Sequence, residues 1–195
     1  MRRVIKSDES EIVKRQLAYR SSHNDEIREI LANEQHCLCA YTETHFGASN
    51  DAHIEHFNPT FKNTTDDNYQ NWFLVKSLWN TRKSTKWADY QPVLHPTAND
   101  LERRILYFDG NYVAADPDDL AANNLIRLLD LDNAHLADER KRYIARKRKE
   151  IDKLRQSAQA YFDDLIVDYP AGVYFIRAIQ EELQVQVNFD LLKTK

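Results

Sequence analysis

The chain has 195 residues, of which 42% are hydrophobic and 30% are charged, with only three glycines and five prolines. This balance excludes a disordered chain and a glycine-rich all-β protein, and it indicates a helix-rich globule with one substantial core. The net charge of −4 gives no overall attraction for a polyanion. Any contact with nucleic acid must therefore come from a local patch.

The sequence carries no signal for a membrane or for secretion. No apolar run approaches the roughly 18 residues of a membrane span, and the start MRRVIKSDESEIVKRQL lacks an apolar segment. We expect a cytoplasmic protein without membrane contact. The two cysteines, Cys37 and Cys39, are too few for a four-thiolate zinc site, so we expect free thiols.

The first 35 residues predict two short helices. Ile12, Val13 and Leu17 share one face of the first helix. Asn24 is expected to cap the second, in which apolar residues recur at helical spacing between positions 27 and 31. Both helices are expected to support the segment that begins at Cys37.

Residues 37–58 lose the helical period and predict two short strands joined by a loop around Gly47, Ser49 and Asn50. The polar stretch TFKNTTDDNYQ predicts another loop. The next segment, NWFLVKSLWNTRKSTK, is an apolar run that ends in a basic, helix-like turn. Its Trp and Phe residues are expected in the core.

The second half begins with RRILYFDGNYVAA, where the Asp109-Gly110 pair between apolar arms predicts a β-hairpin. In the segment ADPDDLAANNLIRLLDL, Asp116 and Pro117 are expected to start a helix. A longer helix is predicted from about Asn133 to Gln159, and Pro170 is expected to open the last one.

The long helix carries an unusual run of positive charge. Between Asp138 and Arg155 there are nine Lys or Arg residues against four Asp or Glu. The run is either a solvated helix face or a surface that contacts phosphates or a partner, and the sequence leaves these readings open.

The stretch AHIEHFNP places a carboxylate between two histidines. Hydrolysis of a phosphodiester requires a base, for which histidine suits because its ordinary pKa of about 6.5 leaves it mostly neutral. It also requires a cation near the phosphate, and carboxylate and amide groups suit that role. The neighbouring residues must decide whether this stretch is such a site.

EHFNP, followed by NYQNWFLVKSLWNTRKS, resembles the ββα-metal motif of HNH endonucleases, in which two residues nine apart follow the acid-His pair. Asn71 and Asn80 have that separation. The flanking CAYTE and VLHPTANDLERRILYFDGNYVAA more specifically resemble PtuB-type HNH proteins, which accompany an ABC-like ATPase in Septu and some retron anti-phage systems. The resemblance covers roughly residues 36–145.

The resemblance implies a role for each matching residue. His56 would be the general base, Asn71 would orient its ring, and Glu55 and Asn80 would bind Mg²⁺ or Mn²⁺. His53 would add a ligand or contact the scissile phosphate. The cations expected to contact nucleic acid, DNA or RNA, are Arg82, Lys83 and Lys86.

The chain departs from the family at a second site. Many relatives hold a structural zinc with two Cys-x-x-Cys pairs, and the matching positions here are Cys39, Thr42, Lys76 and Trp79. One thiolate cannot hold zinc tetrahedrally, so no structural zinc is expected, and packing by Tyr41, Trp72 and Trp79 must replace it. The loss leaves room for an alternative, a non-cutting HNH scaffold that acts as an adaptor for nucleic acid or for the ATPase.

We therefore expect an α+β protein in three parts. Residues 1–35 would be an N-terminal helical segment, 36–95 a ββα-metal nuclease core, and 96–195 a β-hairpin with a mostly helical region. The expected partners are nucleic acid and a PtuA-type ABC-like ATPase, in some systems with a retron reverse transcriptase complex.

Overall fold

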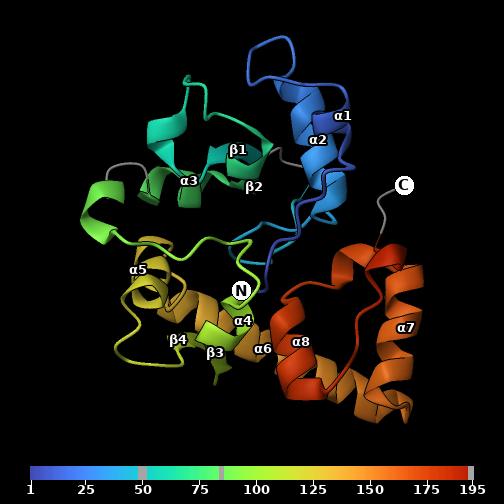
Figure 1. Ribbon diagram of the computed structural model, residues 1–195. Coiled ribbons are helices and arrows are strands. Elements are labelled where there is room, and N and C mark those ends of the chain that lie inside the picture. The colour runs from blue at the N-terminus through green and yellow to red at the C-terminus, as the bar shows by residue number, and fades with distance from the viewer. Residues whose placement is uncertain (48–51, 84–85, 193–195) are drawn as a thin grey trace.

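The computed structural model describes residues 1–47, 52–83 and 86–192, with the backbone alone for 80–82 and 190. It is an α+β structure, 48% helical and 11% strand, with two separate two-stranded antiparallel sheets (Figure 1). The strands are β1 (Ala52–His56), β2 (Trp72–Lys76), β3 (Ile105–Phe108) and β4 (Asn111–Ala114). The helices are α1 (Glu11–Lys14), α2 (Asn24–Glu34), α3 (Ser77–Lys83), α4 (Leu101–Arg104), α5 (Leu120–Leu128), α6 (Ala134–Leu154), α7 (Ala158–Asp168) and α8 (Ile176–Leu183).

Two N-terminal helices form and pack against the first sheet, but the predicted face of the first was wrong in part, because α1 ends at Lys14, before Leu17, and Val13 is exposed. Their buried residues Ile12, Ile27 and Leu31 share one apolar cluster with Ile54, Trp72 and Leu74. The prediction that Asn24 caps α2 was wrong, because the N-cap is His23 and it makes no side-chain capping bond. The helices therefore support the β1–β2 sheet through packing.

The order β1, β2, α3 agrees with what the resemblance implies, whereas the residue pattern alone predicts both strands before Asn58. β1 pairs with β2 so that His56 faces Trp72 and Glu55 faces Phe73, and α3 follows β2 directly. Trp72, Phe73 and Leu74 are buried as expected. Of the two strands predicted before Asn58, only the second forms within the described residues, since the first is reduced to a single bridge between Leu38 and His45.

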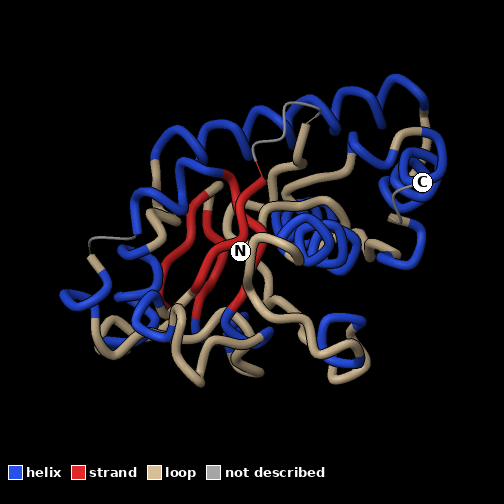
Figure 2. The backbone as a smooth tube through the Cα atoms, turned by 90° about the horizontal axis from the view of Figure 1, so that it is seen from above, coloured by secondary structure: helices blue, strands red, loops and turns tan. Residues whose placement is uncertain are grey.

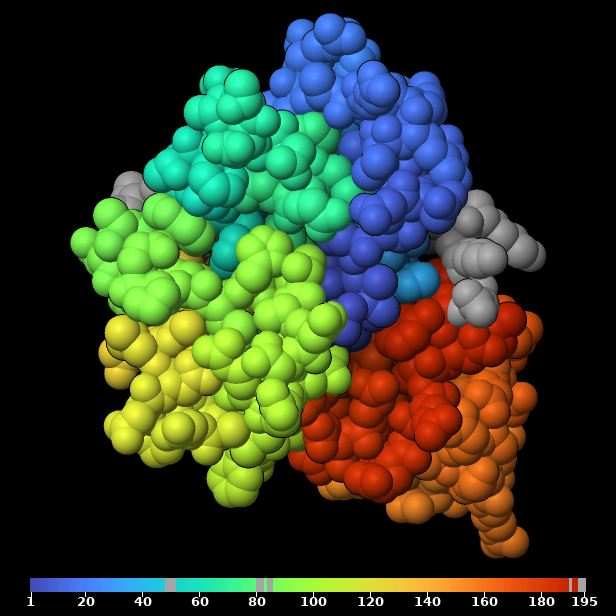
Figure 3. Space-filling model, viewed as in Figure 1, coloured from blue at the N-terminus to red at the C-terminus, as the bar shows by residue number. Residues whose placement is uncertain are grey.

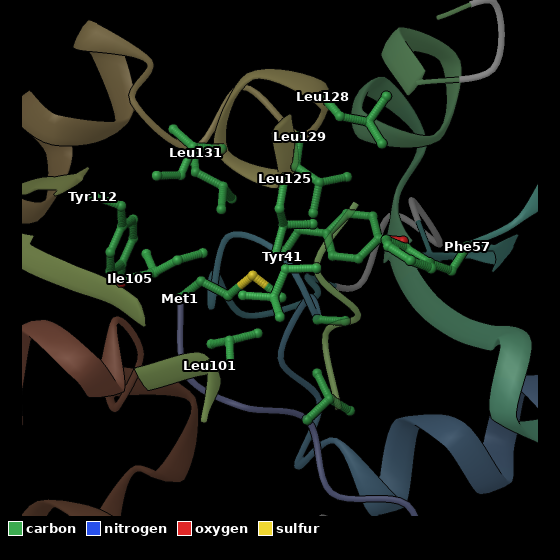
Figure 4. Close-up of a cluster of buried hydrophobic side chains, with 14 of the residues drawn as sticks. Met1, Tyr41, Phe57, Leu101, Ile105, Tyr112, Leu125, Leu128, Leu129 and Leu131 are labelled. Carbon is green, nitrogen blue, oxygen red and sulfur yellow. The ribbon is translucent and has the colours of Figure 1, made fainter. Parts of the chain in front are cut away.

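One core joins the β1–β2 region to the second half of the chain. Tyr41 and Phe57 pack in the same cluster as Leu101, Leu125 and Leu129 (Figure 4). Residues from all three predicted segments contribute to this cluster. The region of β1, β2 and α3 therefore packs against the middle of the chain and does not form a separate globule.

The second sheet forms at the predicted place. Asp109 and Gly110 join β3 to β4, and both have positive φ, at 47° and 81°. The predicted start of α5 was wrong, because Asp119 caps it by accepting a 3.0 Å bond from the backbone N–H of Ala122. Arg104 fixes the same carboxylate with two 2.7 Å bonds, so Asp119 is better held than Asp116.

The predicted long helix is two helices. α6 ends at Leu154 because Arg155 takes the left-handed conformation, and Ser157 then caps α7. The last helix begins at Ile176 and not at Pro170, which opens a short 3-10 turn. Figure 2 shows α6 as the long helix along one side of the molecule.

The basic run on α6 is less exposed than its sequence indicates. Arg140 is fully buried, with its guanidinium over the ring of Tyr112 and a 2.8 Å bond to the Gly110 carbonyl. Lys147 is buried and donates to Tyr161. Arg146 and Lys149 remain exposed. Fewer basic side chains of α6 therefore reach solvent than the sequence predicted. Figure 3 shows the C-terminal helices as a region apart from the β1–β2 region on this face.

Candidate functional site

A cavity of about 280 Å³ lies beside β1, and we call it the β1 cavity. It brings together three predicted site residues, His53, Glu55 and His56. Its other lining residues are Tyr19, Asn24, Arg28, Ile54, Pro59, Lys62 and Lys83. Arg28 and Lys62 at this hollow can attract a phosphate although the chain as a whole has a net charge of −4.

His56 is the last residue of β1 and its side chain is only 6% exposed. Nε2 lies 3.1 Å from Asp67 Oδ1, at ion-pair distance but without the alignment of a hydrogen bond. The Tyr19 ring packs edge-on at 4.5 Å. Burial lowers the pKa of His56, and the Asp67 carboxylate opposes this only in part. The imidazole is therefore neutral at pH 7 and able to accept a proton.

Asp67 is a site residue that the sequence reasoning missed. Its Oδ1 accepts a 2.5 Å bond from Trp72 Nε1, and its Oδ2 accepts a 2.9 Å bond from the backbone N–H of Asn63. Both oxygens are thus held in place beside His56. The two neighbouring acids in TTDDNYQ are a signal for an acidic site residue, but nothing in the local pattern distinguishes Asp67 from Asp66.

Asn71 has a different role from the predicted one. Its side chain does not orient the His56 ring but holds the backbone of Asn58, accepting a 2.7 Å bond from the N–H and donating 3.0 Å to the carbonyl. The cross-strand partner of His56 is Trp72, so the residue before Trp72 faces the chain beyond His56. Asn71 therefore fixes the turn that follows the base.

Glu55 and Lys83 form a buried ion pair. Each side chain is 2% exposed, and the Lys83 ammonium contacts Glu55 Oε1 and donates to the backbone carbonyls of His56 and of Phe57, the latter at 2.6 Å. Burial raises the pKa of Glu55 to about 7 although Lys83 opposes the rise, and burial lowers the pKa of Lys83. Lys83 was predicted to contact the nucleic-acid backbone, but its side chain is buried and its ion pair and hydrogen bonds are all internal.

The remaining predicted residues are less closely grouped. His53 lines the β1 cavity and is exposed, while Lys86 is exposed outside the cavity lining. The side chains of Asn80 and Arg82 lie outside the described residues. Arg28 and Lys62, which sequence reasoning missed, line the cavity as exposed or half-exposed cations. Arg28 also pairs with Asp25 at 2.6 Å, whereas Lys62 lies over the Tyr19 ring at 5.3 Å.

A hard divalent cation needs several oxygen donors around it. Within the described ranges, no group of three His, Cys, Asp or Glu side chains is placed to hold a metal. Glu55 offers one buried carboxylate at the cavity, but its Oε1 already contacts the Lys83 ammonium, so a hard cation there would have to share or replace that contact. Mg²⁺ is often held by one or two protein oxygens together with water and substrate phosphates.

The segment at residues 39–43, where the resemblance would place two of the zinc ligands, forms a defined turn. The backbone N–H of Glu43 donates to the Cys39 carbonyl at 2.9 Å, and that of Ala40 donates to the Leu74 carbonyl on β2 at 3.0 Å. Cys39 and Thr42 are buried, and both cysteines are free thiols. Backbone bonds and packing hold this turn against β2.

Comparison of the chain with family models, with curated proteins and with solved structures finds no match. No helix within the described residues is both long enough and apolar enough to cross a membrane.

Proposed function

We propose that this chain is a metal-dependent HNH endonuclease of the PtuB type, which hydrolyses phosphodiester bonds in nucleic acid. The observation that supports this most is the pairing of a buried neutral His56 with Asp67, next to a buried carboxylate, at a cavity lined by Arg28 and Lys62. The order β1, β2, α3 and the position of His56 at the end of β1 agree with the resemblance.

The geometry suggests how His56 acts. With the Asp67 carboxylate at Nε2, the proton of the neutral ring lies on Nε2 and the lone pair on Nδ1. Nδ1 then removes a proton from a water molecule, whose oxygen attacks phosphorus as the bond to the 3′ oxygen breaks, and the leaving 3′ oxygen takes a proton from solvent water. The products are a 5′-phosphate and a 3′-hydroxyl. Asp67 stabilises the imidazolium that forms, as a carboxylate does for a catalytic histidine elsewhere.

Glu55 and Asn80 would hold Mg²⁺ or Mn²⁺, which when bound neutralises charge on the phosphate and on the leaving oxygen. Arg28 and Lys62 would place the phosphate through charge alone, without reading sequence.

The direct test is cleavage by the purified chain. DNA and RNA are each incubated with Mg²⁺, with Mn²⁺ and with EDTA, and the ends of any product are sequenced. We expect cutting that requires the metal and leaves 5′-phosphates. Asn80→Ala should be partly rescued by more metal, because weakened coordination responds to concentration.

The Lys83–Glu55 pair favours one alternative, a catalytically degenerate HNH scaffold that acts as an adaptor. A lysine that already neutralises Glu55 weakens the case for a second cation there. The adaptor binds nucleic acid or the ATPase but cuts neither DNA nor RNA, even with the ATPase present. The same cleavage assay separates the two functions.

We also propose an ABC-like ATPase of the PtuA type as partner. The exposed Arg146 and Lys149 on α6 form a positive surface away from the β1 cavity, whereas Arg148 is paired with Glu182 at 2.7 Å. Reversing Arg146 and Lys149 to glutamate should reduce co-purification with the ATPase and leave cutting by the isolated chain intact. Weaker cutting with a smaller salt dependence would instead assign this surface to phosphates.

A further inference from the structure

A second hollow, of about 270 Å³, lies next to the β1 cavity, and we call it the Trp87 hollow. We propose that it binds one base of the nucleic-acid strand whose phosphate enters the β1 cavity. This inference rests on the proposed nuclease function and adds how the substrate strand is held.

Among the described residues, the two hollows have no lining residue in common, but lining residues of one lie next to lining residues of the other. Phe57, which lines the Trp87 hollow, directly follows His56 in the chain. The Lys83 ammonium lines the β1 cavity and lies 5.5 Å from the centre of the Trp87 ring. A base and the phosphate attached to its sugar are similarly close neighbours, so one nucleotide or two adjacent ones can fill both hollows.

The walls of the two hollows differ in charge. Arg28, Lys62 and Lys83 line the β1 cavity together with one carboxylate, Glu55, which is paired with Lys83. Among the described residues that line the Trp87 hollow, none is Lys or Arg, and Asp66 adds a negative charge. A phosphate is therefore favoured in the first hollow and disfavoured in the second, whereas a neutral base is accepted there.

Aromatic rings provide stacking surface for a base. Trp87 is half-buried and packs edge-on against Phe57 at 5.2 Å, and Phe61 is 37% exposed at the same hollow. His95 packs edge-on against Phe57 at 4.8 Å. Proteins that bind single strands stack bases on such rings, with each stacked base contributing about 1–3 kcal/mol.

Neutral polar groups provide partners for the edge of a base. The Gln91 amide nitrogen donates to the Trp87 carbonyl at 2.9 Å, which leaves its oxygen as an acceptor, and the Gln70 amide makes no hydrogen bond to the described residues. His95 Nδ1 accepts from the backbone N–H of Thr97 at 3.3 Å, so Nε2 carries the ring proton. Burial lowers the pKa of His95 to about 4, which keeps this donor neutral.

The test measures binding and not cutting, in the non-cutting His56→Ala background. The two probes are a short single-stranded oligonucleotide of mixed sequence and a tetrahydrofuran phosphate chain of equal length and charge that has no bases. Trp87→Ala should weaken binding of the oligonucleotide about 5-fold to 150-fold and leave the baseless chain unchanged. Trp87→Phe should retain most of the affinity because it keeps an aromatic ring.

Two further variants keep the test decisive. Phe61→Ala changes an exposed residue of the hollow and should weaken only oligonucleotide binding even if Trp87→Ala does not fold. Phe108→Ala removes an aromatic ring that is 71% exposed on β3 and should change neither probe. Equal losses for both probes, or no loss in Trp87→Ala and Phe61→Ala, would overturn the base site.

The wild-type cleavage assay keeps the two proposals apart. Base-dependent binding without any cutting would leave the hollow assigned and refute the nuclease. Cutting by the wild-type chain without a base-dependent contribution from Trp87 or Phe61 would support the nuclease and refute the base site. An absence of binding to either probe would overturn the base site directly.

Discussion

The two small sheets have the same architecture, but the first buries ionisable side chains and the second buries an aliphatic and an aromatic one. Each is one antiparallel pair, but β3 and β4 are joined by two residues, whereas residues 57–71 separate β1 from β2. The second sheet buries Ile105 and Tyr112 and exposes Phe108. The first buries Glu55 and His56, which are groups that cost free energy to remove from water.

The burial of these ionisable groups at the first sheet lowers the stability of the fold, which indicates that this sheet has a role other than folding. The long connection between β1 and β2 provides Asp67, which the two-residue turn of the other sheet has no room to provide. Buried ionisable groups gathered at a cavity are typical of functional sites, although structural ion pairs also occur. A chemical role for the first sheet and a structural role for the second predict different responses to mutation.

Loss of the base should have the largest effect. His56→Ala should reduce the rate of metal-dependent cleavage about 10²-fold to 10⁴-fold, because a positioned proton acceptor is removed. Circular dichroism should show a folded protein. Phe108→Ala on the second sheet is the control and should cut at the wild-type rate. Equal rates in both variants would place the chemistry elsewhere.

Breaking the buried ion pair should cost stability. Lys83→Met leaves Glu55 without its cation and should lower the free energy of unfolding by about 3–5 kcal/mol. Glu55 already has a folded pKa near 7, above its ordinary value, so its contribution to stability falls as the pH rises from about 4.5 to about 7. Without Lys83 the pKa rises further, and the loss should be smaller at pH about 5 than at pH about 8.

Urea unfolding at the two pH values measures this loss. Lys86→Met, at an exposed lysine outside the β1 cavity, should change the free energy of unfolding by less than about 0.5 kcal/mol. A Lys83→Met protein as stable as Lys86→Met at pH about 8 would show that the pair contributes nothing.

Removing the charge of Asp67 should change both the rate and its pH dependence. Asp67→Asn should reduce the cleavage rate about 10-fold to 100-fold, as loss of a residue that orients a functional group does. The Asp67 carboxylate raises the pKa of His56, so its loss lowers that pKa further. The acid limb of the rate profile should therefore move to lower pH. A limb that stays in place would show that Asp67 does not act on His56.

The second sheet should respond through stability alone. Gly110→Ala places a Cβ 2.7 Å from the Ala137 carbonyl oxygen at a φ of 81°, and should cost about 1–3 kcal/mol. Gly47→Ala is the control, since its Cβ would meet nothing within 4 Å. Cleavage per folded molecule should be unchanged in both variants. A cleavage defect in Gly110→Ala would give the second sheet a part in the chemistry.

Zinc removal should have the smallest effect. Elemental analysis of protein purified without chelators should find no stoichiometric zinc, because the matching positions offer only the Cys39 thiol. Dialysis against EDTA should leave the unfolding midpoint unchanged. One zinc per chain would show that the first sheet region is held by metal after all.

Local signals predicted those elements whose partners lie nearby in the chain. The Asp109-Gly110 pair predicted the β3–β4 hairpin, and the basic end of the apolar run from Trp72 predicted a helical turn where α3 forms, whereas β2 was implied only by the resemblance. His56 and Glu55 were predicted by their neighbours in one short motif, and the structure places both at one cavity.

The parts that sequence did not predict depend on long-range contacts. Lys83 reaches Glu55 across 28 positions, and a basic residue after a helix gives no sign that it is buried. Asp119, not Asp116, caps α5 because Arg104 holds its carboxylate. The division of the long helix at Arg155 requires a backbone conformation that the helical pattern of apolar residues does not reveal.

The contacts of Lys83 also have a mechanical consequence. Lys83 is the last residue of α3, and its ammonium donates hydrogen bonds to the main-chain carbonyls of His56 and Phe57 at the end of β1. The helix end and the strand end are thus tied through one side chain, in addition to the β2 link between them. A molecule that pulls on α3 therefore shifts the main chain that carries His56, and it does so without touching the histidine.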